Sequence, residues 1–482
     1  MKMLHHSRRD ILFLLVMLLW PSLAGHSQSG SPAAAFEQAK RDPERLRTLL
    51  KEMPKGGELH LHLSAAVRFD RLLDIAIRHG YRVGFQHDTL LVCGFARPAL
   101  APQWEEPCRP GNVVFKPAAE LSEEERKRLH EALTVTRQDA DRDEKAGFAE
   151  FIRVFARLEE LVGNADVIPK LVQEAMEQAA AHKVSYLELK LNPIGRKDSK
   201  GKPMKIEELV ARLTAAAAEK NRQLAPGKSV TVKFIVLLHR RNPQQPGGIT
   251  DVPAIACTPD CSSRLRQGYF VAARRLAGTV VGIDLAGLPE EEVGSPGYLP
   301  VAFQMLRDEF GEASITLHAG ETRNPSWTHH IAQAIAAGAN RIGHAFNLEH
   351  TAEAKSLVCE RRILLEISLT SNLLIGLLPQ DDLRAHPFPR YFRGEICPKT
   401  AHSKRGYLPV TLNTDDPGVF QTDLTQEFFL ATTTFDLSWD EVKQLCRNSL
   451  TRAFATPAER QALLQRWERE MAEFEATRLR AP

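Results

Sequence analysis

Eight short apolar runs recur along the chain, and most of them are separated by segments whose apolar positions have helical spacing. The runs are residues 58–62, 184–191, 230–238, 280–285, 314–318, 341–344, 363–368 and 407–413. Continuous apolar strands that alternate with helices predict a parallel sheet covered on both faces. Eight such units are the number in a closed (β/α)8 TIM barrel. An open doubly wound sheet is the alternative, but no G-x-G-x-x-G follows the first strand.

The helical spacing also gives an outline of the domains. Helices are predicted at residues 36–53, 67–79, 148–163, 165–182, 206–224, 262–276, 298–310, 328–337, 352–360, 438–450 and 457–478. We expect a leader and N-terminal helix at 25–53, an α/β barrel at 54–455 and a C-terminal helix at 456–482. The 482-residue length fits one large barrel with insertions as well as it fits two or three domains.

Residues from about 84 to 147 interrupt this rhythm. Four prolines crowd together there, between and just beyond Cys93 and Cys108, and a charged segment with helical spacing follows at residues 122–144. The region is predicted to be an insertion after the first strand and helix, either a subdomain or a lid. A surface loop with no function explains the composition equally well.

The first 24 residues have the pattern of a signal peptide. Lys2, Arg8 and Arg9 precede the nearly unbroken apolar run of residues 11–20, and the small residues Ser22 and Ala24 follow. The run is too short for an ordinary membrane span, although an uncleaved anchor is the alternative. We expect export to the periplasm or the extracellular space, by the general or the twin-arginine route. After cleavage, no stable membrane association is expected.

Charge and cysteine content narrow the function classes. The formal net charge is +3, and no basic stripe with interleaved aromatic residues is present, so no nucleic-acid partner is expected. Seven cysteines in an exported chain permit disulfides. The close pairs are Cys93 with Cys108 and Cys257 with Cys261, and the odd count predicts at least one free, buried thiol. The sequence predicts no oligomeric state.

The first strand carries the candidate chemistry. His60 and His62 are two residues apart, and on a β-strand such positions face the same side. Both imidazoles are therefore able to reach one metal ion. Two ordinary strand histidines would give the same pattern, so the motif alone decides nothing.

Polar residues at the ends of later predicted strands strengthen the metal interpretation. His318 ends the fifth strand, His344 the sixth, and Asp415 and Asp416 follow the eighth. In a closed barrel these ends meet at one mouth. We predict one Zn²⁺ per chain, bound by His60, His62, His318 and Asp415 together with a water.

The remaining polar residues have predicted roles around that water, whose pKa zinc lowers to about 7. Glu321 is the candidate general acid and base, and His344 the group that orients the attacking oxygen. Asp416 is a candidate contact to a substrate nitrogen. Singly, His344 also fits a core histidine, Glu321 a helix N-terminal carboxylate, and the Asp-Asp-Pro sequence an ordinary turn.

As a set, these motifs resemble the adenosine deaminase family. The resemblance runs from about residue 53 to 450. The stretches that carry it are Met-Pro-Lys-Gly-Gly-Glu-Leu-His-Leu-His at 53–62, Gly-Ile-Asp-Leu-Ala-Gly at 282–287, His-Ala-Gly-Glu at 318–321, Arg-Ile-Gly-His at 341–344, Thr-Ser-Asn at 370–372 and Asn-Thr-Asp-Asp-Pro at 413–417. The resemblance implies hydrolytic deamination of adenosine or a close relative at a zinc site. It also implies that Glu321 protonates purine N1, and that Asp416 and Gly287 contact N7 and N3.

The resemblance leaves the sugar end of the substrate open. The family pattern has Asp-Gly after the second histidine and its leucine, whereas this chain has Ser64-Ala65, and position 345 is Ala where Gly is usual. Ser64 and His239 are the candidate sugar contacts; His239 follows a likeness to the secreted, growth-factor-like branch of the family and fits a surface histidine equally well. Adenosine, 2′-deoxyadenosine and 5′-modified adenosines all remain candidate substrates.

Two other functions compete with this hypothesis. One is another metal-dependent C–N hydrolase of the same superfamily; a two-metal version would need a bridging lysine, for which Lys190 is the candidate. The other is a secreted binding or signalling protein on an inactive barrel. The intact set of ligands and acid argues against both.

Overall fold

The computed structural model describes residues 31–87, 89–97, 108, 111–136, 144–240, 248–249, 259–287, 298–324, 329–397 and 407–479. The predicted signal peptide, residues 1–24, lies outside these ranges. In the part of the chain that is described, no helix is both long and apolar enough to cross a membrane.

The eight predicted strands form a closed parallel barrel. They are β1 (Gly56–His62), β5 (Val184–Leu191), β6 (Thr231–Arg240), β8 (Val280–Ala286), β9 (Thr316–Ala319), β10 (Arg341–His344), β11 (Leu364–Ile367) and β12 (Val410–Leu412). Parallel pairing gives one sheet in the order β1-β5-β6-β8 and a second sheet in the order β9-β10-β11-β12. Parallel bridges from Ile283 to Ile315 and from Leu61 to Asp415 close the circle. The barrel is therefore favoured over the open sheet.

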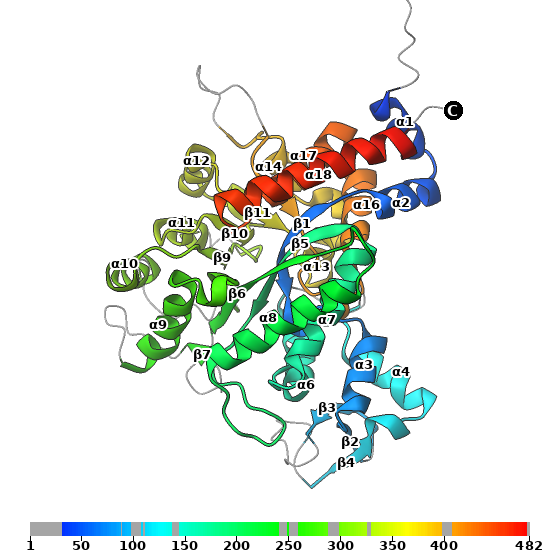
Figure 1. The fold of residues 1–482 in the computed structure, drawn as a ribbon, viewed down its shortest axis with the longest axis vertical. Helices are drawn as coiled ribbons and strands as arrows, with labels where there is room; N and C mark the ends of the chain where they lie inside the picture. The colour runs from blue at the N-terminus through cyan, green and yellow to red at the C-terminus, as the bar shows by residue number, and fades with distance from the viewer. Residues whose placement is uncertain are drawn as a thin grey trace, which may run out of the picture.

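Helices surround the barrel (Figure 1) and cover the apolar side chains of its strands, among which charged side chains are also buried. They are α3 (Phe69–Arg78), α6 (Glu144–Val162), α7 (Ile168–Ala181), α8 (Ile206–Gln223), α9 (Pro259–Ala273), α10 (Tyr298–Phe310), α11 (His329–Ala336), α12 (Ala352–Arg361), α13 (Leu369–Leu374), α14 (Phe388–Phe392), α15 (Pro417–Phe420) and α16 (Leu424–Phe435). A two-residue strand, β7 (Gly248–Ile249), extends the pairing of β6. The predicted strand and helix positions agree with these bounds to within a few residues at most ends.

The inserted region contains a small antiparallel sheet. Strands β2 (Arg82–Gln86), β3 (Val92–Ala96) and β4 (Val113–Pro117) pair in the order β3-β2-β4, and α4 (Glu123–Ala132) follows. Figure 1 places this sheet, with α3 and α4, at the opposite end of the molecule from the terminal helices. The helix predicted for residues 122–144 is shorter in the structure, because α4 ends at Ala132.

The N-terminal prediction needs a correction. The single helix expected at residues 36–53 is two helices, α1 (Pro32–Ala39) and α2 (Pro43–Glu52). Asp42 caps the second helix by accepting hydrogen bonds from two backbone N–H groups, and Pro43 lacks the N–H that a continuous helix requires. Apolar spacing continues across the break, which is why the sequence pattern did not reveal it.

The C-terminal helices close the end of the barrel where the strands begin. Helices α17 (Trp439–Thr451) and α18 (Pro457–Arg478) lie there, as Figure 1 shows. The indole N–H of Trp467 donates to the carbonyl of Pro54, and Ser449 accepts from the backbone N–H of Gly57. A side chain at Gly56 would lie 2.9 Å from the carbonyl oxygen of Cys446, so the strand begins in direct contact with α17.

Two disulfides are present among the described cysteines. Cys93 pairs with Cys108, as one of the predicted close pairs, and Cys359 pairs with Cys397. Cys446 is a free, buried thiol, which confirms the expectation from the odd count. The other predicted pair includes Cys257, which lies outside the described residues.

Candidate active site

Three histidine side chains from two strands converge at the carboxyl end of the barrel. The Nε2 atoms lie 3.1 Å apart for His60 and His318, 3.4 Å for His60 and His62, and 3.2 Å for His62 and His318. All three residues are buried. The two-residue spacing on β1 places both of its rings on one face, as the sequence predicts.

Asp415 completes the group from β12's carboxyl end. Its Oδ1 lies 3.2 Å from Nε2 of His60 and of His62, and its Oδ2 accepts from the Ser371 hydroxyl at 2.8 Å. The residue has a left-handed backbone, φ 63°. Backbone hydrogen bonds across the barrel closure hold it there: Asp415 N–H donates to His60, and His62 N–H donates to Asp415. The surrounding structure thus maintains a conformation that costs energy locally.

These four atoms fit a metal ion. Ligands bound tetrahedrally to zinc at about 2.0–2.1 Å lie about 3.3–3.4 Å from one another, close to the separations found here. Two buried hydrogen bonds support the same conclusion. Nδ1 of His60 is 2.7 Å from Glu366, and Nδ1 of His318 is 3.0 Å from Asp284. With the proton on Nδ1, each ring turns the lone pair of Nε2 toward the common point, as metal-bound histidines do.

A buried charged network lies beneath the histidines. Lys190 contacts Asp284 at 2.7 Å, Glu366 at 3.2 Å and Nδ1 of His60 at 2.8 Å. We assign the His60 proton to the bond with Glu366, because the ammonium of Lys190 has two carboxylates to pair with. Arg341, at the start of β10, contacts Glu366 at 2.7 Å and Glu188 at 2.5 Å, which extends the network away from the histidines to Glu188 on β5.

The charge of this network suits a divalent cation. Lys190 and Arg341 are its two cations, and its four carboxylates are Glu188, Asp284, Glu366 and Asp415, which leaves two negative charges unbalanced. Burial opposes ionisation of Asp284, but the neighbouring His318 ring and the Lys190 ammonium hold its pKa well below the usual range. Burial likewise opposes ionisation of Asp415, and His60 and His62 hold its pKa well below normal.

His344 and Glu321 lie beside the four converging atoms. His344 Nε2 is 3.5 Å from Oε1 of Glu321 and 3.9 Å from Oδ2 of Asp415. Burial lowers the pKa of His344 to about 3, so the ring is neutral. The ring nitrogens of His344, His60 and His318 and a carboxylate oxygen of Asp415 all lie within 4.8 Å of one another. By distance alone, His344 is thus also a possible metal ligand.

The local backbone brings these groups close together. His344 has φ 64° and Ala345 φ 51°, both in the left-handed region. Glycine, the usual residue of the family pattern at position 345, adopts this conformation without strain, whereas Ala345 adopts it at an energetic cost. A side chain at Gly343 would lie 2.7 Å from Cε1 of His60, so the imidazole ring packs directly against the backbone of β10 only because residue 343 is glycine.

The predicted substrate residues lie around the same mouth. Asp416 is buried, and burial, followed by the charges of Asp415 and Glu321, raises its pKa well above normal. Gly287 follows β8 directly, and Ser64 lies in the turn just after β1. His239 is next to last in β6, where its backbone pairs with Ala286, and its side chain is outside what the structure describes.

Comparison with known proteins identifies the family. The sequence model described as "Adenosine deaminase" matches residues 115–469, more than half of the chain. The chain belongs to the adenosine deaminase family. It is 36% identical to an adenosine deaminase of Enterococcus faecalis over 187 residues, which are 39% of this chain and 49% of that relative. The chain therefore aligns with about half of that relative's length.

Other members of the adenosine deaminase family align over more of the chain. The N6-methyl-AMP deaminase of Homo sapiens is 26% identical over 347 residues, which are 70% of this chain and 84% of that protein. The crystal structure of Arabidopsis ADAL complexed with IMP has a TM-score of 0.61 at 22% identity, covering 88% of this chain and 99% of that one. The structural likeness agrees with the barrel found here.

The inserted region contacts loops at the mouth of this adenosine deaminase family barrel. Glu144, at the start of α6, accepts a hydrogen bond from the backbone N–H of Arg323, two residues beyond Glu321, at 3.1 Å. Val135 donates to the carbonyl of Val419, close to Asp416. The segment that follows α4 and the first residue of α6 therefore contact the two loops that carry Glu321 and Asp416.

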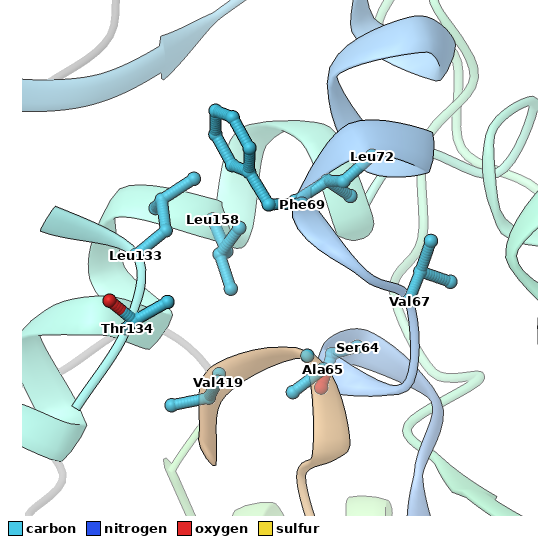
Figure 2. Close-up of a pocket in the computed structure, with 10 residues that line it drawn as sticks. Ser64, Ala65, Val67, Phe69, Leu72, Leu133, Thr134, Leu158 and Val419 are labelled. Carbon is cyan, nitrogen blue, oxygen red and sulfur yellow. The ribbon is translucent and has the colours of Figure 1, made fainter. Parts of the chain in front are cut away.

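A cleft lies beside the turn that follows β1, between this turn and the inserted region (Figure 2). It contains about 270 Å³ of empty space, part of it open to solvent, and is lined by Ser64, Ala65, Val67, Phe69, Leu72, Leu133, Thr134, Leu158, Gly418 and Val419. None of these ten residues is charged. Ser64, the candidate sugar contact, is one of the residues in its wall.

Several site residues escaped the sequence reasoning. Glu366 and Asp284 hold the histidines, and no motif spacing identifies them as their partners. Lys190, the candidate bridging residue of a two-metal site, instead pairs with both of these carboxylates, which gives it a different role. Asn372 and His386 also lie in the site. Asn372 belongs to the Thr-Ser-Asn stretch, which was the one sequence signal for this pair of residues.

Proposed function

We propose that this protein is a zinc-dependent aminohydrolase that converts adenosine, 2′-deoxyadenosine or a 5′-modified adenosine to the inosine product and ammonia. The observation that carries the proposal is the meeting of His60, His62, His318 and Asp415 beside Glu321 and His344. The four would hold one Zn²⁺ per chain, and the ion, when bound, lowers the pKa of a coordinated water to about 7.

The chain's own residues supply the remaining steps. Glu321 would give a proton to purine N1 while the water oxygen attacks C6. One proton of the attacking water replaces the proton that Glu321 gave to N1, and the other goes to N6. The C6–N6 bond then breaks, ammonia leaves, and the oxygen becomes the carbonyl of the product, which keeps the proton on N1. Asp416 would contact N7, Gly287 N3, and Ser64 and His239 the sugar. Burial of Glu321 and Asp416 limits the access of other water molecules to these two groups.

The apolar cleft beside Ser64 favours nucleosides over nucleotides. A 5′-phosphate requires cationic or N–H donors, and none of the described residues that line the cleft has a charged side chain. Relatives named N6-methyl-AMP deaminase act on a substrate with such a phosphate, so the nucleotide is the second candidate substrate. The cleft lining is the observation that sets it second.

The test is an ultraviolet assay with purified, zinc-loaded protein. Adenosine, 2′-deoxyadenosine, a 5′-deoxy analogue, AMP and N6-methyl-AMP are compared, and zinc content is measured in every sample. We expect conversion of the nucleosides, and loss of activity in Glu321→Gln with one zinc still bound. Conversion of only the nucleotides would overturn the substrate assignment, and an active Glu321→Gln variant would overturn the role of the acid.

We also propose export of the mature protein to the periplasm or the extracellular space. The support is the charged start, apolar run and small-residue cleavage pattern of residues 1–24. Expression of the full chain, followed by cell fractionation and N-terminal sequencing, tests it. A mature N-terminus near Gly25 outside the cytoplasm is expected, and retention of Met1 in the cytoplasm would contradict the proposal.

A further inference from the structure

A chain of three buried hydrogen bonds leads from a backbone N–H group to the ring of His344. The backbone N–H of Phe388 donates to Nδ1 of His386 at 3.0 Å. Nε2 of His386 lies 3.0 Å from Oδ1 of Asn372, and Nδ2 of Asn372 lies 3.2 Å from Nδ1 of His344. All three side chains are buried, His344 and Asn372 completely and His386 to 2% exposure.

The direction of every bond in this chain follows from its first donor. A backbone N–H is always a donor, so Nδ1 of His386 must accept, and the proton of its neutral ring is on Nε2. That N–H needs an acceptor, which fixes Oδ1 of Asn372 on its side. The amide NH2 of Asn372 therefore faces His344, and Nδ1 of His344 accepts. The backbone, and no choice of amide orientation, sets this order.

The order decides where His344 carries its proton. Because Nδ1 accepts, the proton of the neutral ring is on Nε2, which points toward Glu321 and Asp415. Nε2 has no hydrogen-bond partner among the described residues. A protonated ring nitrogen has no lone pair to give to a metal. His344 thus differs from His60 and His318, whose Nδ1 atoms face carboxylates.

We propose that His386 and Asn372 are positioning residues that hold His344 in the Nε2–H tautomer. In this tautomer His344 donates a hydrogen bond to the attacking oxygen and stays out of the metal shell, which leaves His62 as the third histidine ligand. The identity of the attacking oxygen rests on the proposed deaminase function; the tautomer itself does not.

The surrounding structure keeps the amide in place. Asn372 lies on α13, and Glu427 accepts hydrogen bonds from the first two N–H groups of that helix, at Leu369 (2.8 Å) and Thr370 (3.3 Å). On the other side, the ring of Phe346 meets His386 edge to face, with centroids 5.4 Å apart. A side chain held from both ends transmits a defined orientation and does not average between two.

The tautomer is measured directly by nuclear magnetic resonance, with the metal-free full-length protein labelled with ¹⁵N-histidine. Two-bond ¹H–¹⁵N correlations distinguish the protonated ring nitrogen from the bare one, and the His344→Gln variant assigns the signals. We expect a proton on Nε2 of His344 in the wild type. In Asn372→Asp the carboxylate accepts from both rings, so Nδ1 of His344 gains a proton. A wild-type proton on Nδ1, or an unchanged Asn372→Asp spectrum, overturns the proposal.

A pair of variants at His386 separates positioning from mere packing. Gln keeps an N–H donor near the place of Nε2, whereas Leu removes it. In a serine protease, the wrong tautomer of the catalytic histidine lowers kcat about 10⁴-fold. We expect His386→Leu to lower kcat about 100-fold and to leave KM within about 3-fold of the wild-type value. His386→Gln is expected to stay within about 5-fold of wild type. Equal losses in the two variants would show a packing role only and overturn the proposal.

A second control separates general loss of stability from loss of the tautomer. Asn448→Asp alters a buried amide on α17 that donates to the carbonyl of Val410. Neither residue belongs to the relay of hydrogen bonds that runs from Phe388 to His344. The Asn448→Asp substitution should lower the melting temperature and leave the His344 signals unchanged; altered signals there would count against the relay. If the wild type converts no purine substrate, the deaminase function fails, and the spectra still decide the tautomer.

Discussion

Replacing Glu366 with Gln tests whether the network beneath the site prepares His60 to bind a metal. Oε2 of Glu366 faces Nδ1 of His60 and the ammonium of Lys190, and Oε1 faces the Thr316 hydroxyl and the Arg341 guanidinium. Gln has the same shape but only one oxygen. Whichever way the amide turns, its NH2 group meets two donors, so two hydrogen bonds are lost.

The expected magnitude follows from these contacts. Partners of metal-bound histidines typically contribute 10–100-fold to metal affinity, which is about 1.4–2.7 kcal/mol. Removing one member of a buried charge network costs about 3–5 kcal/mol of stability. We therefore expect Glu366→Gln to bind zinc 10–100-fold more weakly and to unfold at a lower temperature, even without metal.

Competition with a chromophoric chelator at fixed pH measures the zinc affinity, and thermal unfolding of the metal-free protein measures the stability. Glu188→Gln is the matched control, because Glu188 contacts Arg341, Tyr186 and the backbone of Phe454 but no histidine. It should lose stability and keep most of its zinc affinity. A folded Glu366→Gln protein that binds zinc within about 2-fold of wild type would refute the reasoning, and so would an equal loss of affinity in both variants.

Three further predictions concern the metal, the pH and a disulfide. Chelation should lower the melting temperature and added zinc restore it, because a ligand at 1,000 times its Kd stabilises by about 4 kcal/mol; an unchanged melting curve would contradict a metal site. Partial burial opposes ionisation of Glu459, but Lys233 and the α18 cap lower its pKa to about 2. The carboxylate therefore stabilises the fold above pH 4.5, its ordinary pKa, and the effect disappears as the pH falls toward 2. Glu459→Gln should cost about 0.5–1 kcal/mol at pH 7, after allowance for solvent screening, and almost nothing at pH 2, by urea titration. Cys359→Ser should lower the free energy of unfolding by up to about 4 kcal/mol, since the bond to Cys397 spans 38 residues; equal stability of variant and wild type would show that the bond adds none.

The sequence predicted the barrel because each strand carries its own signal. Buried parallel strands are short and fully buried, and the predicted segments 184–191 and 341–344 match β5 and β10 at both ends, although each also carries charged residues. Short strands were located less well: residues 407–413 contain only the three-residue β12. The other four residues lie outside the strand, although Pro409 and Asn413 still hydrogen-bond to β11, and apolar character alone does not locate such a boundary.

The site was predictable only where chemistry coincided with strand ends. His60, His62, His318 and Asp415 stood at such ends, and the structure brings them together. Their supporting partners follow from three-dimensional packing. Glu366 is 306 residues from His60, and its neighbours in the sequence give no sign of a shared bond. The disulfide from Cys359 to Cys397 was missed for the same reason, because its two halves are 38 residues apart.

The closure between β1 and β12 has a consequence for the order of folding. The hydrogen bonds that join Asp415 to His60 and His62 connect the first and last strands of the barrel, with more than 350 residues between them. Contacts this distant in sequence form late, and proteins that depend on them fold slowly. A nascent chain emerging from the ribosome contains His60 early but lacks Asp415 until the barrel is nearly complete. Zinc uptake would therefore report completion of the chain, and a truncated product that ends before β12 would lack a site able to retain the ion.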